Sequence, residues 1–197
     1  MLIGLTGQMG CGKTTAAAIF KKAGACVIDA DRIGREVVED SALLRHRLKI
    51  AFGTDIFDKR GKLRRKILAV RAFATSENHA RLNAMVHPYL LKELRKQIKT
   101  VKKNCRLVVV DAALLLDWNL DREMDFVLVV HTSREKRLQW LLKRKISRQD
   151  ALARLKNQLT FSVFRQRADR VILNSGSVAD LKRKINALLA KILRQTD

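Results

Sequence analysis

The chain contains 197 residues, of which 41 are Lys or Arg and 19 are Asp or Glu, so its formal charge at pH 7 is +22. With 47% hydrophobic residues the composition excludes an intrinsically disordered protein, and no apolar run approaches the roughly 18 residues that a membrane helix requires. The length fits one hydrophobic core, and the basic excess favours a polyanionic partner, either a phosphorylated small molecule or nucleic acid.

Five short apolar runs alternate with helical stretches along the chain, which is typical of a parallel α/β sheet. The predicted strands cover residues 2–6, 25–28, 106–110, 125–130 and 170–173. An alanine-rich helix is predicted over 14–22, with Gly24 as its stop signal. The last helix is predicted to open at Ser177, with Asp180 as its capping partner.

Residues 7–14 match the phosphate-loop pattern G-x-x-x-x-G-K-[ST] in full, between a predicted strand and a predicted helix. The glycines allow successive backbone N–H groups to point at phosphate oxygens. We expect Lys13 to bridge the β- and γ-phosphates of ATP and the Thr14 hydroxyl to ligate Mg²⁺. Cys11 is interpreted as a small filler residue. The residues expected to bind ATP are Gly10, Cys11, Gly12, Lys13, Thr14 and Thr15.

The phosphate loop alone leaves a kinase, a GTPase and an ATPase open. A GTPase is disfavoured because no N-K-x-D motif follows either D-x-x-G match. Asp111 ends the third predicted strand, where a carboxylate near Mg²⁺ is expected, although an Asp there can also simply cap the next segment.

Two carboxylates, Asp29 and Asp31, follow the second predicted strand at the edge where open α/β sheets bind their ligands. A small-molecule kinase needs a base beside the acceptor hydroxyl, and Asp31 is our candidate for that base. The alternative is that Asp31 is the N-cap of a helix that runs through Val37.

Between the second and third predicted strands lie about 75 residues with helical periodicity. The only proline of the chain, Pro88, is expected to start or kink a helix there. A further helical stretch is predicted over 135–158. Three segments, 59–71, 92–106 and 134–148, together carry 19 of the 22 net positive charges. Solvated helix faces without a partner are the alternative interpretation of each segment.

The cysteines and the N-terminus bear on the cellular compartment. Cys11, Cys26 and Cys105 are odd in number and lack C-x-x-C spacing, so we expect neither a disulfide framework nor a zinc site. The first ten residues lack the features of a targeting peptide, and we expect a cytoplasmic protein.

Several segments of the chain match the motifs of one known enzyme family. They begin with residues 4–7, the phosphate loop, and 29–31 followed by Arg35. Residues 82–88 are similar to a segment L-x-x-x-x-H-P and contain His87. Residues 111–117 are similar to D-x-P-L-L-x-E, and 168–176 to A-D-x-V-I-x-N-x-G. In these motifs, and in their order over nearly the whole chain, the sequence resembles the dephospho-coenzyme A kinase family.

The chain departs from the family pattern in the segment 111–117 and in the expected lid. Ala113 replaces a proline, and Asp117 replaces a glutamate. In the expected lid, Trp140 stands where the family often has its first arginine, and Arg144 is the best match to the second. Arg137, Lys143 and Arg148 are alternatives to Arg144. Trp118 and Trp140 are interpreted as packing residues rather than as base-stacking platforms.

The resemblance implies a P-loop fold with a parallel sheet of about five strands, a helical substrate-binding insertion and a helical lid. The core would comprise 1–31, 105–137 and 167–197, the CoA-binding region 32–104, and the lid 138–166. The implied reaction transfers the γ-phosphate of ATP to the ribose 3′-hydroxyl of dephospho-CoA, the last step of coenzyme A synthesis. It would be a Mg²⁺-dependent reaction.

The resemblance and the residues together assign roles at the site. Asp31, Lys13 and Arg144 are expected to be catalytic, and Arg35 and His87 are expected to join Asp31 in binding substrate. The expected partners are the small molecules ATP and dephospho-CoA, with nucleic acid bound at most nonspecifically, no membrane, and a monomer or weak oligomer. A nucleic-acid-binding ATPase and a kinase of another small acceptor are the rival hypotheses.

Overall fold

The computed structural model describes residues 1–156 and 158–194, and the chain divides into two compact units. The first unit is formed by Met1–Asp29 together with Val101–Asp197, and the second by Ala30–Thr100.

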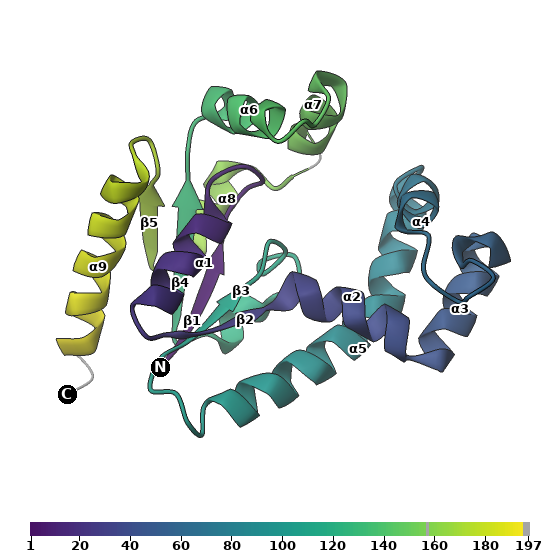
Figure 1. Ribbon diagram of the computed structural model, residues 1–197, viewed down its shortest axis with the longest axis horizontal. Coiled ribbons are helices and arrows are strands. Elements are labelled where there is room, and N and C mark those ends of the chain that lie inside the picture. Colours follow the sequence, from purple (N-terminus) through teal and green to yellow (C-terminus); the bar gives the residue numbers. More distant parts are fainter. Residues whose placement is uncertain (157, 195–197) are drawn as a thin grey trace. The chain divides into compact units, whose positions relative to one another are not determined.

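The first unit is built on a sheet of five parallel strands in the order β2-β3-β1-β4-β5 (Figure 1). The strands are β1 (Leu2–Thr6), β2 (Cys26–Asp29), β3 (Val108–Asp111), β4 (Phe126–His131) and β5 (Arg170–Leu173). The predicted α/β class with a five-stranded parallel sheet is confirmed. β1 and β3 are completely buried, as expected for inner strands of a parallel sheet.

Two helices, α1 (Lys13–Lys22) and α9 (Val178–Arg194), pack against each other on the same side of the sheet (Figure 1). Their apolar faces share one core with alternate residues of the strands. The buried residues of this core include Ile3, Leu5, Ile19, Phe20, Val109, Leu128, Val130, Leu181 and Ile185. This packing fixes the start of α1, and therefore the phosphate loop, at the end of β1.

The segment between β3 and β4 closes against the sheet at Gly4, where a Cβ would lie 2.7 Å from Cγ of Met124. This segment contains the short 3₁₀ helix η2 (Leu120–Glu123). Arg167 holds it: Nε donates to Asp121 at 2.8 Å, Nη1 to the carbonyl of Leu116 at 2.8 Å, and Nη2 to Asn119 at 3.0 Å.

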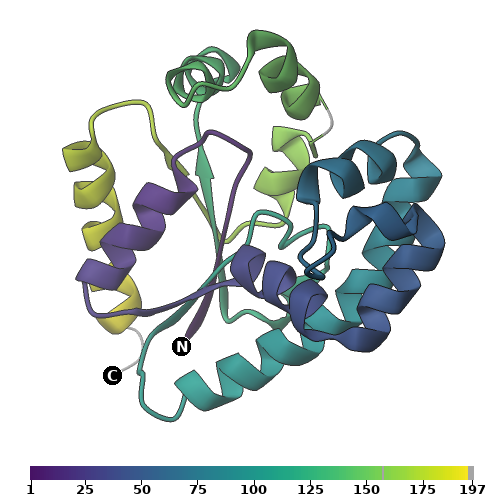
Figure 2. The same cartoon turned by 45° about the vertical axis from the view of Figure 1, so that its right-hand side comes forward.

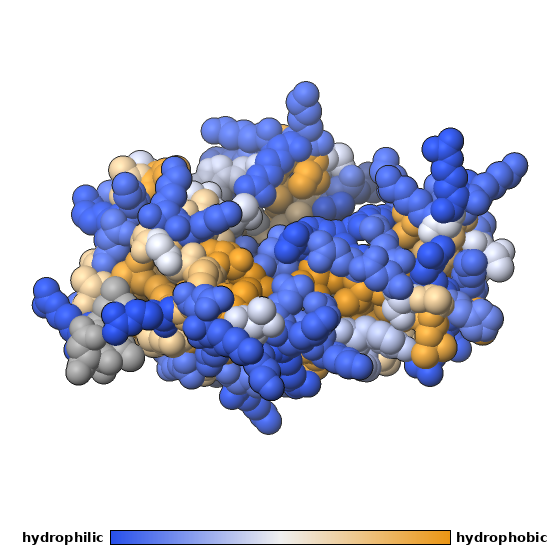
Figure 3. Space-filling view, turned by 60° about the horizontal axis from the view of Figure 1, so that its bottom comes forward, coloured by the Kyte–Doolittle hydropathy of each residue, from blue (hydrophilic) through white to orange (hydrophobic). Residues whose placement is uncertain are grey.

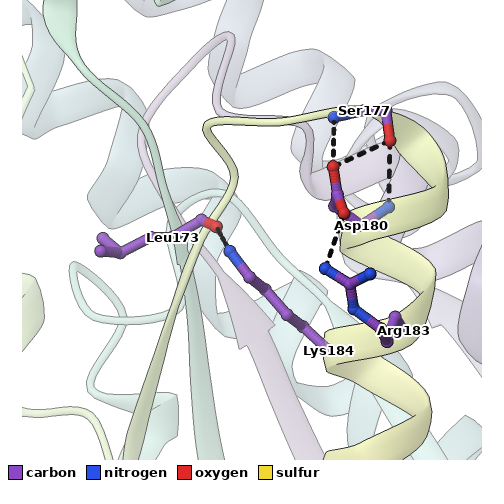
Figure 4. A network of polar contacts seen from close by, with 5 residues as sticks. All are labelled: Leu173, Ser177, Asp180, Arg183 and Lys184. Atoms are coloured by element: carbon purple, nitrogen blue, oxygen red, sulfur yellow. Dashed lines mark hydrogen bonds and ion pairs between the residues drawn. The ribbon is translucent and has the colours of Figure 1, made fainter.

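The predicted capping pair at the start of α9 is confirmed (Figure 4). The backbone N–H of Ser177 donates to the Asp180 carboxylate at 3.1 Å, and the Asp180 N–H donates to the Ser177 hydroxyl at 3.2 Å. Lys184, one turn further along, donates to the carbonyl of Leu173 at 2.6 Å and so links α9 to the end of β5.

The second unit is helical, as predicted for this stretch, and Figure 2 shows its helices gathered around one another. It contains α2 (Ala30–Asp40), α3 (Ala42–Phe52), η1 (Thr54–Ile56), α4 (Arg65–Ala72) and α5 (Ser76–Val101). Its core is a separate cluster that includes Val38, Leu44, Leu48, Phe52, Ile56 and Leu68. Pro88 does not start a helix but lies inside α5.

The helical stretch predicted over 135–158 consists of two helices, α6 (Arg134–Lys143) and α7 (Arg148–Lys156). A third helix, α8 (Phe161–Gln166), follows within the range 138–166 that was expected to be a helical lid. The chain leaves the helical conformation after α6, and Lys145 has a φ of 61°. A lysine in this left-handed region ends a helix, and neither a proline nor a glycine marks the break in the sequence.

The sequence predicts no disulfide framework, but the structure has a disulfide between Cys26 and Cys105. Their Cα atoms lie 6.2 Å apart although 79 positions separate them in the sequence. The parallel pairing of β2 with β3 brings the start of β2 beside the residues that precede β3. The insertion of the second unit between these strands hides their proximity from the sequence. Cys11 is free and buried.

Hydrophilic side chains project from most of the face shown in Figure 3, and hydrophobic side chains show between them in smaller areas. Among the helices of residues 1–156 and 158–194, none is both long enough and apolar enough to cross a membrane.

Candidate active site

The phosphate loop connects β1 to α1 in a conformation that requires glycine. Gly10 and Gly12 have φ values of 78° and 96°. A Cβ on Gly12 would collide with the side-chain amide of Asn174. The same amide donates to the carbonyl of Cys11 at 2.9 Å. Asn174 therefore ties the loop to the end of β5, a role that was not assigned from the sequence although its A-D-x-V-I-x-N-x-G segment was noted.

The loop lysine and the carboxylate at the end of β3 form an ion pair. Lys13 Nζ lies 2.5 Å from Asp111 Oδ1, and their side chains are only 14% and 10% exposed. The β2–β3 register places Asp29 opposite Asp111, so two carboxylates end neighbouring strands at one edge of the sheet. Asp111 therefore forms an ion pair with Lys13 of the loop, so capping the next segment is not its only interaction.

The thiol of Cys11 is buried inside the loop, and this burial raises its pKa to about 11. At neutral pH the side chain is therefore a protonated thiol and a poor nucleophile. This state is consistent with the interpretation of Cys11 as a small filler residue.

A cavity of about 430 Å³ lies beside the loop in the first unit. Arg144, the expected lid arginine, and Thr15 both line it. Trp140 also lines this cavity and is half-buried, although it was interpreted as a packing residue. The other lining residues are Gly12, Lys143, Asn174, Gly176, Ser177, Val178 and Leu181. Its volume and its aromatic and aliphatic walls suit a small organic group.

Gln158 and Leu159 also form hydrogen bonds with the phosphate loop. The backbone N–H of Met9 donates to Gln158 Oε1 at 3.1 Å, and Gln8 Nε2 donates to the carbonyl of Leu159 at 2.9 Å. Arg137 Nη1 lies 3.5 Å from the same Gln158 oxygen, and the arginine is only 6% exposed. The burial of Arg137 was missed, because the basic segment 134–148 shows an excess of charge but not which side chains face inward.

The expected acceptor-side residues belong to the second unit. α2 begins at Ala30, so Asp31 lies in its first turn and the alternative that it is the N-cap is wrong. Arg35 lies one turn further along the same helix, and His87 lies on α5. Burial and the positive charge of Arg95 lower the pKa of His87, so its imidazole is neutral at pH 7. Lys13, Thr14 and Arg144 lie in the first unit.

Comparisons with known proteins show which family the chain is similar to. The family model described as dephospho-CoA kinase matches residues 1–180. The chain is 38% identical, over 96% of its length and 98% of the relative, to a dephospho-CoA kinase from Corynebacterium glutamicum.

Solved structures are similar along the whole chain. A protein from Thermus thermophilus superposes with a TM-score of 0.82 at 31% identity, covering 97% of each chain. The dephospho-CoA kinase from Campylobacter jejuni superposes with a TM-score of 0.76 at 25% identity, covering 100% of this chain and 98% of that one.

Proposed function

The chain belongs to the dephospho-CoA kinase family, and from that premise we propose that its phosphate loop and Asp31 transfer the γ-phosphate of ATP to the ribose 3′-hydroxyl of dephospho-CoA. It is an ATP-dependent phosphotransferase. The observation that carries the proposal for this chain is the complete phosphate loop at the start of α1, with Lys13 held beside Asp111.

ATP binds through the loop backbone. The N–H groups of Gly10 to Thr15 and the positive end of α1 face the β- and γ-phosphates, and Lys13 neutralises the charge between them. Phosphoryl transfer depends mostly on positioning and charge neutralisation. Arg144 adds a cation from the segment 138–166, which we propose as the lid. The adenine base occupies the cavity that Trp140 lines.

The chemistry of the residues at this edge of the sheet is compatible with a magnesium ion. Thr14 is exposed at the start of α1, and Asp29 and Asp111 end neighbouring strands. Their hydroxyl and carboxylate oxygens are the kind of ligand that Mg²⁺ prefers. We propose that Thr14 would ligate Mg²⁺, with Asp111 as a carboxylate near the ion, and that the ion would neutralise phosphate charge when bound.

Asp31 is the proposed base that accepts the proton of the acceptor hydroxyl. It lies in the first turn of α2, two residues after the end of β2 along the chain. Arg35 offers a cation for a phosphate group of dephospho-CoA. His87, as a neutral imidazole, offers a hydrogen-bond donor and an acceptor. The region 32–104 is the proposed CoA-binding region.

A coupled assay with ATP, Mg²⁺ and dephospho-CoA tests this function. ADP and CoA should form in equal amounts, with the new phosphate on the 3′-oxygen. ATP hydrolysis that RNA or DNA stimulates, without any acceptor phosphorylation, would instead favour a nucleic-acid-dependent ATPase. Phosphorylation of another small acceptor at a higher kcat/KM would show that the substrate is assigned wrongly.

A further inference from the structure

Arg137, on α6, is a buried cation that has no buried counter-charge among the described residues. Its side chain is 6% exposed, and Nε has no hydrogen-bond partner among them. Within residues 1–156 and 158–194 no carboxylate forms an ion pair with it. In that part of the chain its one side-chain hydrogen bond goes to the neutral oxygen of Gln158, 3.5 Å from Nη1. A guanidinium remains charged in proteins, so this charge is buried without an ion-pair partner in the described part of the chain.

Such an arrangement destabilises a protein unless something else supplies the opposite charge. Moving an ion out of water is unfavourable, and the attraction of a partner ion is what normally offsets it. Burial accordingly lowers the pKa of Arg137. The nearby Arg134 adds repulsion, and the effect of Glu135 is weaker than that of burial. Gln158 accepts a hydrogen bond but carries no charge.

Arg137 lies beside the phosphate loop, so an anion bound by this loop can supply the opposite charge. Its backbone packs against Gly10 of the phosphate loop, where a Cβ would lie 3.1 Å from the Arg137 carbonyl oxygen and 3.3 Å from its Cβ. The oxygen of Gln158 that faces the guanidinium also accepts from the N–H of Met9 in the loop. The positive charges of Lys13 and Arg137 both act on the thiol of Cys11 between them.

We propose that Arg137 is a second phosphate-binding cation of this kinase, fixed beside Gly10, and that the polyphosphate of ATP is the counter-charge it lacks. The proposal rests on the proposed function, since it names a further residue of the same site. Arg137 differs from Arg144, which is exposed at the end of α6 and reaches the nucleotide cavity from the lid segment. Gln158 holds the guanidinium until the phosphates arrive.

The substitution Arg137→Met removes the charge and keeps most of the side-chain length. The nucleotide-free variant should melt at a higher temperature than the wild type, because an uncompensated buried charge is gone. At the same time its affinity for inorganic tripolyphosphate should fall by about 10- to 100-fold, as expected for losing hydrogen bonds to a charged group. If Arg137 had only a structural role, the nucleotide-free Arg137→Met variant would melt at a lower temperature than the wild type.

Two further variants sharpen the test. Arg134→Met removes an exposed arginine from the same helix, and it should leave both the melting temperature and tripolyphosphate binding close to the wild type. Arg137→Lys keeps the charge without the planar fork, and it should bind tripolyphosphate with an affinity between those of the wild type and Arg137→Met.

The measurements are calorimetric titration with tripolyphosphate and with ATP, and thermal melting with and without each. A higher melting temperature together with weaker tripolyphosphate binding in Arg137→Met supports the proposal. An Arg137→Met protein that is less stable or unfolded, or that binds tripolyphosphate like the wild type, overturns it. If the wild type itself binds neither ATP nor tripolyphosphate, the proposed function fails as well, so the two failures are distinguishable.

Discussion

Lys13 Nζ and Asp111 Oδ1 lie 2.5 Å apart, so the end of β3 anchors the lysine of the phosphate loop. The pair is mostly buried, and each group offsets the desolvation of the other. β3 lies next to β1 in the sheet, and β1 leads directly into the loop. The position of Lys13 is therefore set by the sheet as well as by the loop itself.

Replacing Asp111 should harm both stability and catalysis. Asp111→Asn removes the mostly buried carboxylate that pairs with the Lys13 ammonium, which should lower the free energy of unfolding by about 3 kcal/mol. It should also raise the Mg²⁺ concentration needed for half-maximal activity. Urea unfolding and a Mg²⁺ titration of kcat measure the two effects. Asp150→Asn, on the exposed side of α7, is the matched control, and equal behaviour of the two variants would contradict the role of Asp111.

Trp140 should report the arrival of the adenine base. In a Trp118→Phe protein, Trp140 is the only tryptophan, and ATP should quench its fluorescence because the base stacks in the cavity that it lines. Tripolyphosphate, which has no base, should bind with little quenching. Equal quenching by both ligands would mean that Trp140 senses phosphate binding or lid movement and does not contact the base.

The fold was predictable because its main signals are local. Each strand is a short apolar run, and the glycines of the phosphate loop are needed at fixed positions, as Gly12 against Asn174 shows. The features that were missed depend on long-range proximity. Cys26 lies beside Cys105 because β2 pairs with β3, although the second unit separates these two strands in the sequence. Arg137 looks like its basic neighbours in sequence, and only the packing of α6 buries it.

The disulfide should contribute measurably to stability. It closes a loop of about 80 residues, for which the chain-entropy model gives about 4.5 kcal/mol. Cys105→Ser should lower the urea midpoint of the oxidised protein, and dithiothreitol should lower that of the wild type to the same value while leaving the variant unchanged. Thiol titration of the unfolded, unreduced wild type should find one thiol per chain, that of Cys11. Three thiols per chain would contradict the disulfide.

The cap of α9 should make stability depend on pH in acid. Hydrogen bonds from the Ser177 backbone N–H and hydroxyl lower the pKa of Asp180 below its usual value. The ionised carboxylate therefore stabilises the folded state above the pKa of an unfolded Asp, and this stabilisation is lost as the pH falls through the lowered value. Asp180→Asn should be less stable than the wild type at pH 7, with a difference that shrinks toward pH 3. A difference that stays constant across this range would contradict the role of the charge.

The acceptor side of the site is harder to read from sequence than the ATP side. Lys13 and Thr14 belong to a motif whose spacing predicts their roles. Asp31, Arg35 and His87 are separate residues on helices, and their assignment depends on the family segments that contain them. A single carboxylate in the first turn of a helix has no local signature that distinguishes a base from a charge that stabilises the helix.

The most direct test of the whole account is the kcat of Asp31→Asn with ATP and dephospho-CoA, measured beside its Kd for ATP. We expect kcat to fall by about 10²- to 10⁴-fold, as for the loss of a general base, while the Kd for ATP stays near the wild-type value. Asp40→Asn, an exposed carboxylate at the end of the same helix, should keep wild-type kcat. Wild-type turnover in Asp31→Asn would contradict the central claim that Asp31 accepts the proton of the attacking hydroxyl.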